Sequence, residues 1–331
     1  MSLKRLHAEA PAAQDLLSLC AFLAPDGIPH VLLHDHPDLL PEPLATAIRD
    51  PLAFGQALGA LGGYALATIT DEAISVHRLV QTVVRHALGA DQATTWAAAA
   101  VALVAAAFPD RASDADTWPV ATRLLAHAVT VTDGRVLDAP DPAATARLLH
   151  RVTDYLWARG EYAQAKPLAE HALALCERRL GAEHPETARS LNNLASILRA
   201  QGDLHGARAL CERALAICEA RLGPNHPNTA TILSDLADIL RDQGHVDQAR
   251  RLHERALAID EARLGADHPD TATSLTNLAG VLHGQGHLDQ ARTLLERALS
   301  IREAHLGADH PVTVRTRHNL AAVVVALDKQ Q

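Results

Sequence analysis

Leu222-Gly-Pro-Asn-His-Pro227 is the second of four copies of the pattern Leu-Gly-x-x-His-Pro, which returns every 42 residues in this chain of 331. The other copies occupy residues 180–185, 264–269 and 306–311. Another set of positions keeps the same spacing and is always glycine, namely Gly160, Gly202, Gly244 and Gly286. Several positions that share one spacing predict a repeat architecture, in which each unit buries its apolar face against its neighbours.

Each repeat unit is predicted to hold two helices. In the unit that begins with Pro185, proline occupies a first helical position, where its missing N–H is not needed. Apolar residues follow at helical spacing over 191–198, and Gly202 can adopt the positive φ that ends a helix. A second apolar stripe over 204–222 predicts the second helix, which Gly223 ends.

Small residues mark the places where the two helices of a unit approach each other. Ala195, Gly202, Ala207 and Ala214 are spaced 7, 5 and 7 residues apart, and the next two units repeat this spacing. The pattern resembles the tetratricopeptide repeat, whose usual unit is roughly 34 residues. The longer unit here resembles the variant in kinesin light chains and many bacterial signalling proteins. The resemblance implies a mainly α fold over residues 141–331: a right-handed α-α superhelix of about four full units and a final half-unit that binds other proteins.

Residues 1–90 do not follow the repeat and are predicted to form a small α+β domain. Apolar helical stretches are followed by two strand-like runs, 64–69 and 73–76, and by a helix over 77–88. This order is typical of a winged-helix domain.

A short motif in this domain gives a second resemblance. Val76-His-Arg-Leu-Val-Gln81 is similar to the Met-His-Asp-Leu-Val motif of the winged helix in bacterial signal-transduction ATPases with numerous domains (STAND). Those proteins combine a nucleotide-binding module of the NB-ARC type, a winged helix and a C-terminal repeat sensor. The resemblance implies that His77 senses the nucleotide when such a module is present elsewhere, although Arg78 replaces the acid of the family's motif. The alternative is that His77 only caps the helix that follows it.

Residues 91–140 carry two more helical stretches, which we expect to form an adaptor pair ahead of the repeats. The order of winged helix, adaptor and repeats then matches the C-terminal half of a STAND-type protein. No G-x-x-x-x-G-K-[ST] motif occurs in the chain, so no phosphate-binding loop is predicted. We therefore expect no nucleotide hydrolysis by this chain, and we expect any partner nucleotide-binding domain in sequence outside it.

Composition argues against several other classes of protein. The net charge of −9 disfavours a general nucleic-acid binder, and no apolar run is long enough to predict a membrane span. The four cysteines contain no C-x-x-C pair and are interpreted as reduced thiols of a cytoplasmic protein. Lysine is scarce beside abundant arginine and alanine, which favours a bacterial source with a GC-rich genome.

The histidines and acids do not form a predicted catalytic or metal site. His184, His226, His268 and His310 recur once per repeat. Helices pack roughly 8–10 Å apart, so these histidines cannot share one zinc ion, and we expect them to organise the turn before proline. His205, His245 and His253 are interpreted as isolated residues on the repeat surface. The chain is therefore predicted to be non-enzymatic and to need no cofactor.

The binding hypothesis rests on the first helix of each repeat, because these helices line the concave groove of tetratricopeptide arrays. Their polar positions vary between units while their apolar positions stay fixed. The residues predicted to line the groove are Asn192, Asn193, Arg199, Asp235, Asp238, Arg241, Asn277 and Asn319. Side-chain amides can pair with the N–H and C=O groups of an extended peptide. The alternative is that the asparagines tie adjacent helices together.

These patterns predict a sensor segment of a STAND-type signalling protein that captures a protein or peptide ligand; the alternative is a free-standing tetratricopeptide adaptor. The hypothesis that the winged helix binds DNA has less support, since the helix over 77–88 has only Arg78 and Arg85 as fixed cations. The last helix carries Ala321-Ala-Val-Val-Val-Ala-Leu327, which is apolar on more than one face. Because a terminal repeat usually presents a polar outer face, we expect a partner, a second copy through self-association, or further sequence to cover this helix.

Overall fold

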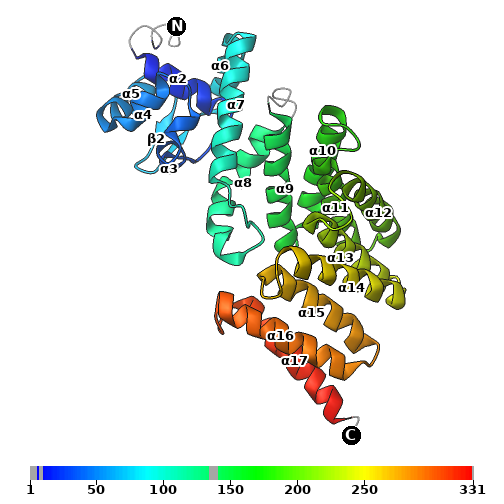
Figure 1. Ribbon diagram of the computed structural model, residues 1–331. Helices are drawn as coiled ribbons and strands as arrows, with labels where there is room; N and C mark the ends of the chain where they lie inside the picture. The colour runs from blue at the N-terminus through cyan, green and yellow to red at the C-terminus, as the bar shows by residue number, and fades with distance from the viewer. Residues whose placement is uncertain (1–5, 7–9, 134–140, 330–331) are drawn as a thin grey trace. The chain divides into compact units, whose positions relative to one another are not determined.

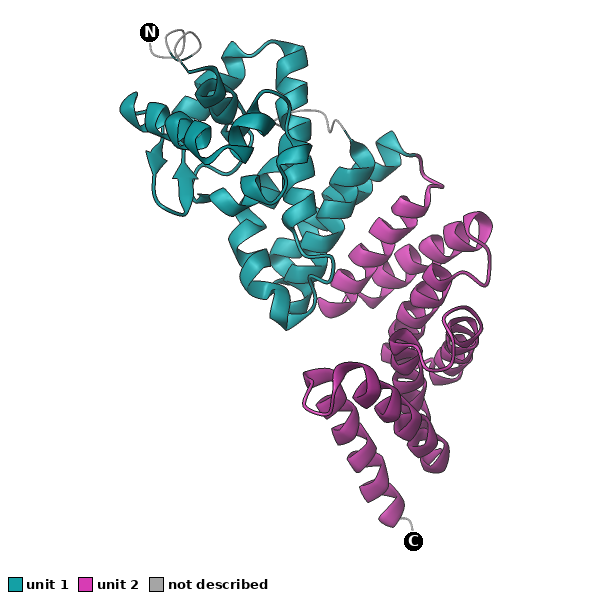
Figure 2. Ribbon diagram, turned by 60° about the vertical axis from the view of Figure 1, so that its left-hand side comes forward, with its two compact units in different colours: residues 1–180 teal, residues 181–331 magenta. Residues whose placement is uncertain are grey.

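The structure is a computed structural model that describes residues 6, 10–133 and 141–329. Two compact units divide the chain, residues 1–180 and 181–331 (Figures 1 and 2). Both are mainly helical, and the second consists of helix pairs that follow the repeat of the sequence. The predicted mainly α fold of tetratricopeptide type is thus confirmed. No described helix has the length and apolar character needed to cross a membrane.

The first unit combines short helices and a small sheet with four longer helices. In chain order its elements are α2 (Pro11–Cys20), β1 (Ile28–Pro29), α3 (His30–His34), η1 (Pro37–Leu39), α4 (Leu44–Arg49), α5 (Pro51–Gly63), β2 (Thr68–Ile69), β3 (Ala73–Ser75), α6 (Arg78–Ala87), α7 (Ala90–Ala107), η2 (Ala115–Thr117), α8 (Trp118–Thr132), α9 (Pro142–Ala158) and α10 (Tyr162–Arg179). Fully buried leucines of α2, with Ile48, Leu61 and Ile74, form the core of its N-terminal part.

The small sheet is antiparallel, with strand order β1-β3-β2. The predicted hairpin is present as β2 and β3, but β2 is shorter than the strand-like run because α5 continues to Gly63 and Ala65 adopts a φ of 54°. Ile28 in β1 pairs with Ile74 in β3. The sequence pattern does not predict β1, because two residues directly before a helix offer no alternation to recognise.

Buried polar side chains hold the helices of the first unit together. Gln81 of α6 is 3% exposed, and its Nε2 donates hydrogen bonds to the carbonyls of Cys20 at 2.8 Å and Leu23 at 3.0 Å. On α9, the Arg151 guanidinium donates to the carbonyls of Phe108 at 2.8 Å and Ala105 at 2.7 Å. Both side chains bind carbonyls at or just beyond the C-terminal ends of α2 and α7, where a helix leaves its last carbonyls without an intrahelical partner.

In the second unit, shown in magenta in Figure 2, residues 181–329 form three helix pairs and a final single helix. α11 packs on α12, α13 on α14 and α15 on α16, and α17 packs on α16. The helices are α11 (Pro185–Ala200), α12 (Leu204–Arg221), α13 (Pro227–Asp242), α14 (Val246–Arg263), α15 (Pro269–Gly284), α16 (Leu288–Leu306) and α17 (Pro311–Asp328).

The Leu-Gly-x-x-His-Pro pattern builds the start of each first helix. The histidine is the N-cap, and its Nδ1 accepts a hydrogen bond from the backbone N–H two residues later, at 3.1 Å for His184, His226 and His268 and 3.3 Å for His310. A threonine that the sequence analysis did not single out adds a second bond: Thr229 Oγ1 donates to the carbonyl of Gly223 at 2.9 Å. These bonds satisfy polar groups at a helix boundary and explain why the turn recurs.

Small residues and glycines permit close helix packing within each pair. Ala195, Ala207 and Ala214 are all 0% exposed, so a larger side chain there would separate the helices. Gly202 has a φ of +86°, in the left-handed region that glycine adopts at little cost. The equivalent alanines of the next two repeats are also fully buried, so the sequence predicted this packing correctly.

Candidate functional site

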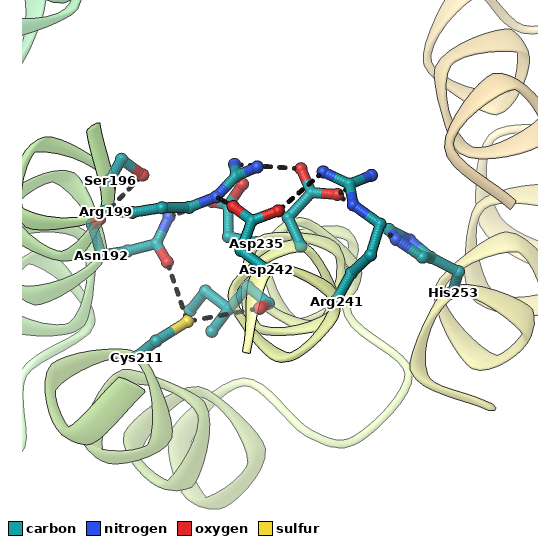
Figure 3. Close-up of polar contacts among 10 residues, drawn as sticks. Asn192, Ser196, Arg199, Cys211, Asp235, Arg241, Asp242 and His253 are labelled. Atoms are coloured by element: carbon teal, nitrogen blue, oxygen red, sulfur yellow. Dashed lines mark hydrogen bonds and ion pairs between the residues drawn. The ribbon is translucent and has the colours of Figure 1, made fainter. Parts of the chain in front are cut away.

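The first helices of the second unit are neighbours, since α11 contacts α13 and α13 contacts α15. This stacking brings polar residues from successive repeats together (Figure 3). Asn192 of α11 donates from Nδ2 to Oδ2 of Asp235 on α13 at 2.5 Å. Cys211 Sγ lies 3.5 Å from Asn192 Oδ1 as a weak donor. Because Asn192 is only 8% exposed, this amide ties two helices together rather than presenting itself to solvent.

A second group of charges lies one to two turns further along the same helices. Arg199 of α11 donates from Nε to Oδ2 of Asp242 at 2.6 Å and from Nη1 to Oδ2 of Asp238 at 3.2 Å. Arg241 of α13 pairs through Nη1 with Oδ1 of Asp238 at 3.0 Å. Burial disfavours the charged guanidinium, but Asp242 and Asp238 outweigh it and raise the pKa of Arg199. We call Arg199, Asp238, Arg241, Asp242 and His253 the Arg199 cluster.

His253 is the fully buried member of this cluster and corrects one sequence interpretation. It was interpreted as an isolated surface residue, but it is 0% exposed, and its Nε2 lies 3.5 Å from Oδ1 of Asp238. Neither ring nitrogen has a hydrogen-bond partner among the described residues. The equivalent residues of the neighbouring repeats, Cys211 and Leu295, are buried as well. The position therefore belongs to the core between helices, and this repeat has a polar histidine where its neighbours have cysteine and leucine.

Two of the three aspartates of α13, Asp235 and Asp238, respond to their surroundings in opposite directions. Burial raises the pKa of Asp235 to about 6, although the hydrogen bond from Asn192 and the charge of Arg199 oppose the rise. Burial acts the same way on Asp238, but His253, Arg241 and Arg199 together lower its pKa below the ordinary value. At neutral pH Asp238 is therefore firmly ionised, whereas Asp235 protonates in mild acid.

The remaining groove candidates are not part of either group. Asn193 is half-buried and has an interaction within the fold. Asn277 on α15 is half-buried and Asn319 on α17 is exposed. Neither amide makes a hydrogen bond within the described part of the chain. Of the eight candidates, five thus pair with one another across or along α11 and α13, while Asn277 and Asn319 keep their amides available.

His77 is exposed at the start of α6, where its Nδ1 accepts a hydrogen bond from the N–H of Leu79 at 3.2 Å. It therefore caps the helix, and its role in sensing a nucleotide stays a prediction. Two apolar side chains one turn apart on the same helix are also exposed: Leu79 is 66% exposed and Val83 is 48% exposed.

Sequence reasoning missed Asp242, Cys211 and His253 as parts of the site. A signal for Asp242 exists, because its equivalents in the neighbouring repeats are Ala200 and Gly284. When one repeat has a charged residue at a position that is small in the neighbouring repeats, the charge indicates a local partner. Among the described residues, no group of three or more His, Cys, Asp or Glu could hold a metal ion.

Comparison with protein families decides the class of the chain. The family model described as Tetratricopeptide repeat matches residues 144–209, 186–262, 239–304 and 279–331, which together span more than half of the sequence. This chain belongs to the tetratricopeptide repeat family. Such repeats are protein–protein interaction scaffolds, and no enzyme family is indicated. Residues 3–93 match a second model, described as Domain of unknown function (DUF7779).

Solved structures of similar tetratricopeptide proteins include two of kinesin light chain nearly identical TPR-like repeats from Podosopora anserina. One is 28% identical, covers 58% of this chain and 90% of that chain, and has a TM-score of 0.49. The other is 29% identical, covers 56% and 89%, and has a TM-score of 0.48. BtubC (BKLC) from P. vanneervenii is 22% identical, covers 70% and 85%, and has a TM-score of 0.47. No curated protein matches the chain.

Proposed function

We propose that this chain captures a protein or peptide along the face formed by the first helices of its repeats. The observation that carries the proposal is that some candidate residues are hydrogen-bonded within the fold and others are not. Asn277 and Asn319 occupy one column of successive repeats and make no hydrogen bond within the described residues, whereas the fold uses Asn192. An amide with a free N–H₂ donor and C=O acceptor suits the backbone of an extended segment. The ligand proposed is therefore an extended stretch of polypeptide.

The paired residues have a supporting role in this proposal. The Asn192–Asp235 bond and the Arg199 cluster fix the spacing between α11 and α13, so the face is organised before a ligand arrives. A pre-organised surface binds with less loss of conformational entropy. Asn193, Arg199, Asp238 and Arg241 would then contact the ligand at the edge of the same face.

The binding proposal can be tested by selecting peptides on the full chain from a random display library. Hydrogen–deuterium exchange is then measured with and without the tightest peptide. We expect slower exchange in α15 and α17, with α12 and the first unit unchanged. Protection confined to the second helices, or to residues 1–133, would place the ligand elsewhere and contradict the proposal.

We further propose that the chain is the sensor segment of a bacterial, cytoplasmic STAND-type protein, with a winged-helix domain at 1–90, an adaptor at 91–140 and repeats at 141–331. Support comes from the helices and antiparallel sheet of the first unit and from His77, Leu79 and Val83, which are all exposed on α6. A nucleotide-binding domain would dock on this part of α6. The competing function, a free-standing adaptor, needs no such domain.

The sequence directly upstream in the gene separates these two functions, since an in-frame phosphate-binding loop belongs only to the first. Binding gives a second test. A recombinant nucleotide-binding domain from that sequence, loaded with ADP, should bind the chain, and His77→Ala should weaken binding. His86→Ala, which changes another exposed histidine of α6, is the matched control. Equal binding by wild type, His77→Ala and His86→Ala would contradict the proposal that His77 contacts the nucleotide-binding domain.

A further inference from the structure

Among the described residues, no second helix of the same repeat packs on the last helix, α17, as one does on each other first helix of the second unit. In α15, Leu275, Ala279 and Leu282 pack against α16, and they are 0%, 0% and 4% exposed. The equivalent residues of α17 are Arg317, Ala321 and Val324. Arg317 and Ala321 are exposed, and Val324 is 38% exposed. The face that receives a second helix elsewhere is therefore open in α17, while a neighbouring side of the helix, which carries Val323, packs on α16. Figure 1 shows the two helices side by side.

The residues of this open face form a stripe with a definite chemical order. Arg317, Ala321, Val324 and Asp328 are spaced 4, 3 and 4 residues apart, which places them on one side of a helix. The centre of the stripe is apolar and its two ends carry opposite charges. Asp328 is exposed, and Arg317 is 46% exposed and pairs with Glu303 at 2.8 Å, which leaves other N–H groups of its guanidinium available.

This order is complementary to itself when the second helix runs in the opposite direction. The midpoint between positions 317 and 328 coincides with the midpoint between 321 and 324. An antiparallel copy therefore places Arg317 opposite Asp328 of the partner subunit and Ala321 opposite Val324 of the partner subunit. A parallel copy would bring like charges together. Two-fold symmetry of this kind makes a closed dimer from a single surface.

We propose that two copies of this chain associate through an antiparallel pairing of their α17 helices, centred between Ala321 and Val324. Each helix then supplies the cover that the second helix of a repeat supplies elsewhere. This interaction is separate from ligand capture, because Asn319 lies on the other side of α17, roughly half a turn from the stripe. Failure of either proposal leaves the other testable.

The size of the apolar patch sets the expected strength of the dimer. Besides Val324, it includes Val325, which is 52% exposed, and the exposed residues Ala321 and Ala322. Stable interfaces bury roughly 1,200–2,000 Å² in total, and two valines and two alanines from each copy supply less than that. We therefore expect a weak dimer, with a dissociation constant on the order of 10–100 μM.

Sedimentation equilibrium of the full chain tests the association. From about 1 μM to about 500 μM, the mass should rise from that of the 35.3 kDa monomer toward that of the dimer. Val324→Glu should stay monomeric over the whole range with an unchanged circular dichroism spectrum. Val129→Glu on α8, where the valine is 37% exposed, is the matched control and should dimerise like wild type. A wild-type chain that stays monomeric, or a Val324→Glu chain that still dimerises, would overturn the proposal.

Single-cysteine variants test the direction of pairing and do not depend on the fold of Val324→Glu. With a rise of 1.5 Å per residue, the two copies of position 321 lie about 4–5 Å apart along an antiparallel pair, and the two copies of position 328 about 16 Å apart. Ala321→Cys should form a disulfide dimer with oxidised glutathione, and Asp328→Cys should not. The native cysteines are buried, so wild type provides the background. Cross-linking of Asp328→Cys alone, or of neither variant, would contradict the antiparallel pairing.

Discussion

Replacing Asp235 by asparagine should stabilise the second unit at neutral pH, although it removes a charged hydrogen-bond acceptor. Burial raises the pKa of this carboxyl from 3.8 to about 6, so above pH 6 the folded protein holds a charge that the unfolded chain carries more easily. Asparagine keeps a side-chain oxygen for the Nδ2 of Asn192 and carries no charge. It is also the residue that three of the other repeats have at this position, Asn193, Asn277 and Asn319.

The magnitude follows from the pKa difference. A rise of about 2 in pKa, at about 1.4 kcal/mol per pKa unit, limits the gain to about 3 kcal/mol. Because Asp235 keeps some contact with solvent, screening reduces this, and we expect a gain of about 1–2 kcal/mol. For a unit of this size that is a rise in melting temperature of roughly 2–8 °C.

The sign of the pH dependence is equally specific. The folded protein binds the Asp235 proton more tightly than the unfolded chain, so this group makes the wild type less stable as the pH rises from about 4 to about 6. The difference in melting temperature between Asp235→Asn and wild type should therefore be small at pH 4, grow through pH 5, and become constant above pH 6.5.

Differential scanning calorimetry across this pH series is the assay. Asp289→Asn, which changes an aspartate whose side chain is 80% exposed on α16, is the control and should stay within about 0.5 kcal/mol of wild type. An Asp235→Asn chain that melts below wild type at pH 7.5 would refute the reasoning. It would mean that the ionised carboxylate contributes more through Asn192 and Arg199 than it loses by burial.

Three further changes test the structural account by thermal melting. Arg199→Ala should destabilise the second unit by about 1 kcal/mol, because a half-buried guanidinium that pairs with Asp242 is lost. An unchanged melting temperature would mean that Arg199 does not stabilise the fold. Gly244→Ala should destabilise by about 1 kcal/mol because its φ is +86°, whereas Gly280→Ala should stabilise by up to about 1 kcal/mol because a Cβ there meets nothing within 4 Å; the reverse order would contradict the backbone assignment. His77→Ala should destabilise the first unit by about 1 kcal/mol through loss of the α6 cap, and no loss would mean that the cap is not formed in solution.

The repeat architecture could be predicted from the sequence because local and long-range signals agree. Ala195 recurs at a fixed spacing, and its burial follows directly from the need for close helix packing. The histidine before each proline was expected to organise the turn, and its Nδ1 does so. By contrast, β1 has no periodic signal, because its two residues depend on a strand more than forty positions later.

The pairing of site residues was less predictable. Asn192 and Asp235 are 43 residues apart, and their contact depends on how far α13 is displaced along α11. That displacement results from the packing of whole helices and leaves no mark on either residue. His253 is different, because the equivalent residues of the neighbouring repeats are Cys211 and Leu295. Comparing these equivalent positions predicts that His253 is buried.

The most direct test of the central claim is the affinity of a selected peptide for the chain in which Asn277 and Asn319 are both replaced by alanine. Fluorescence anisotropy with the tightest library peptide gives the dissociation constant, and Asn228→Ala, an exposed asparagine in the first turn of α13, is the matched control. We predict a dissociation constant at least about tenfold higher for the double variant, with the control and both melting temperatures unchanged. A double variant that binds the peptide as tightly as wild type would show that the first helices of the repeats are not the binding face.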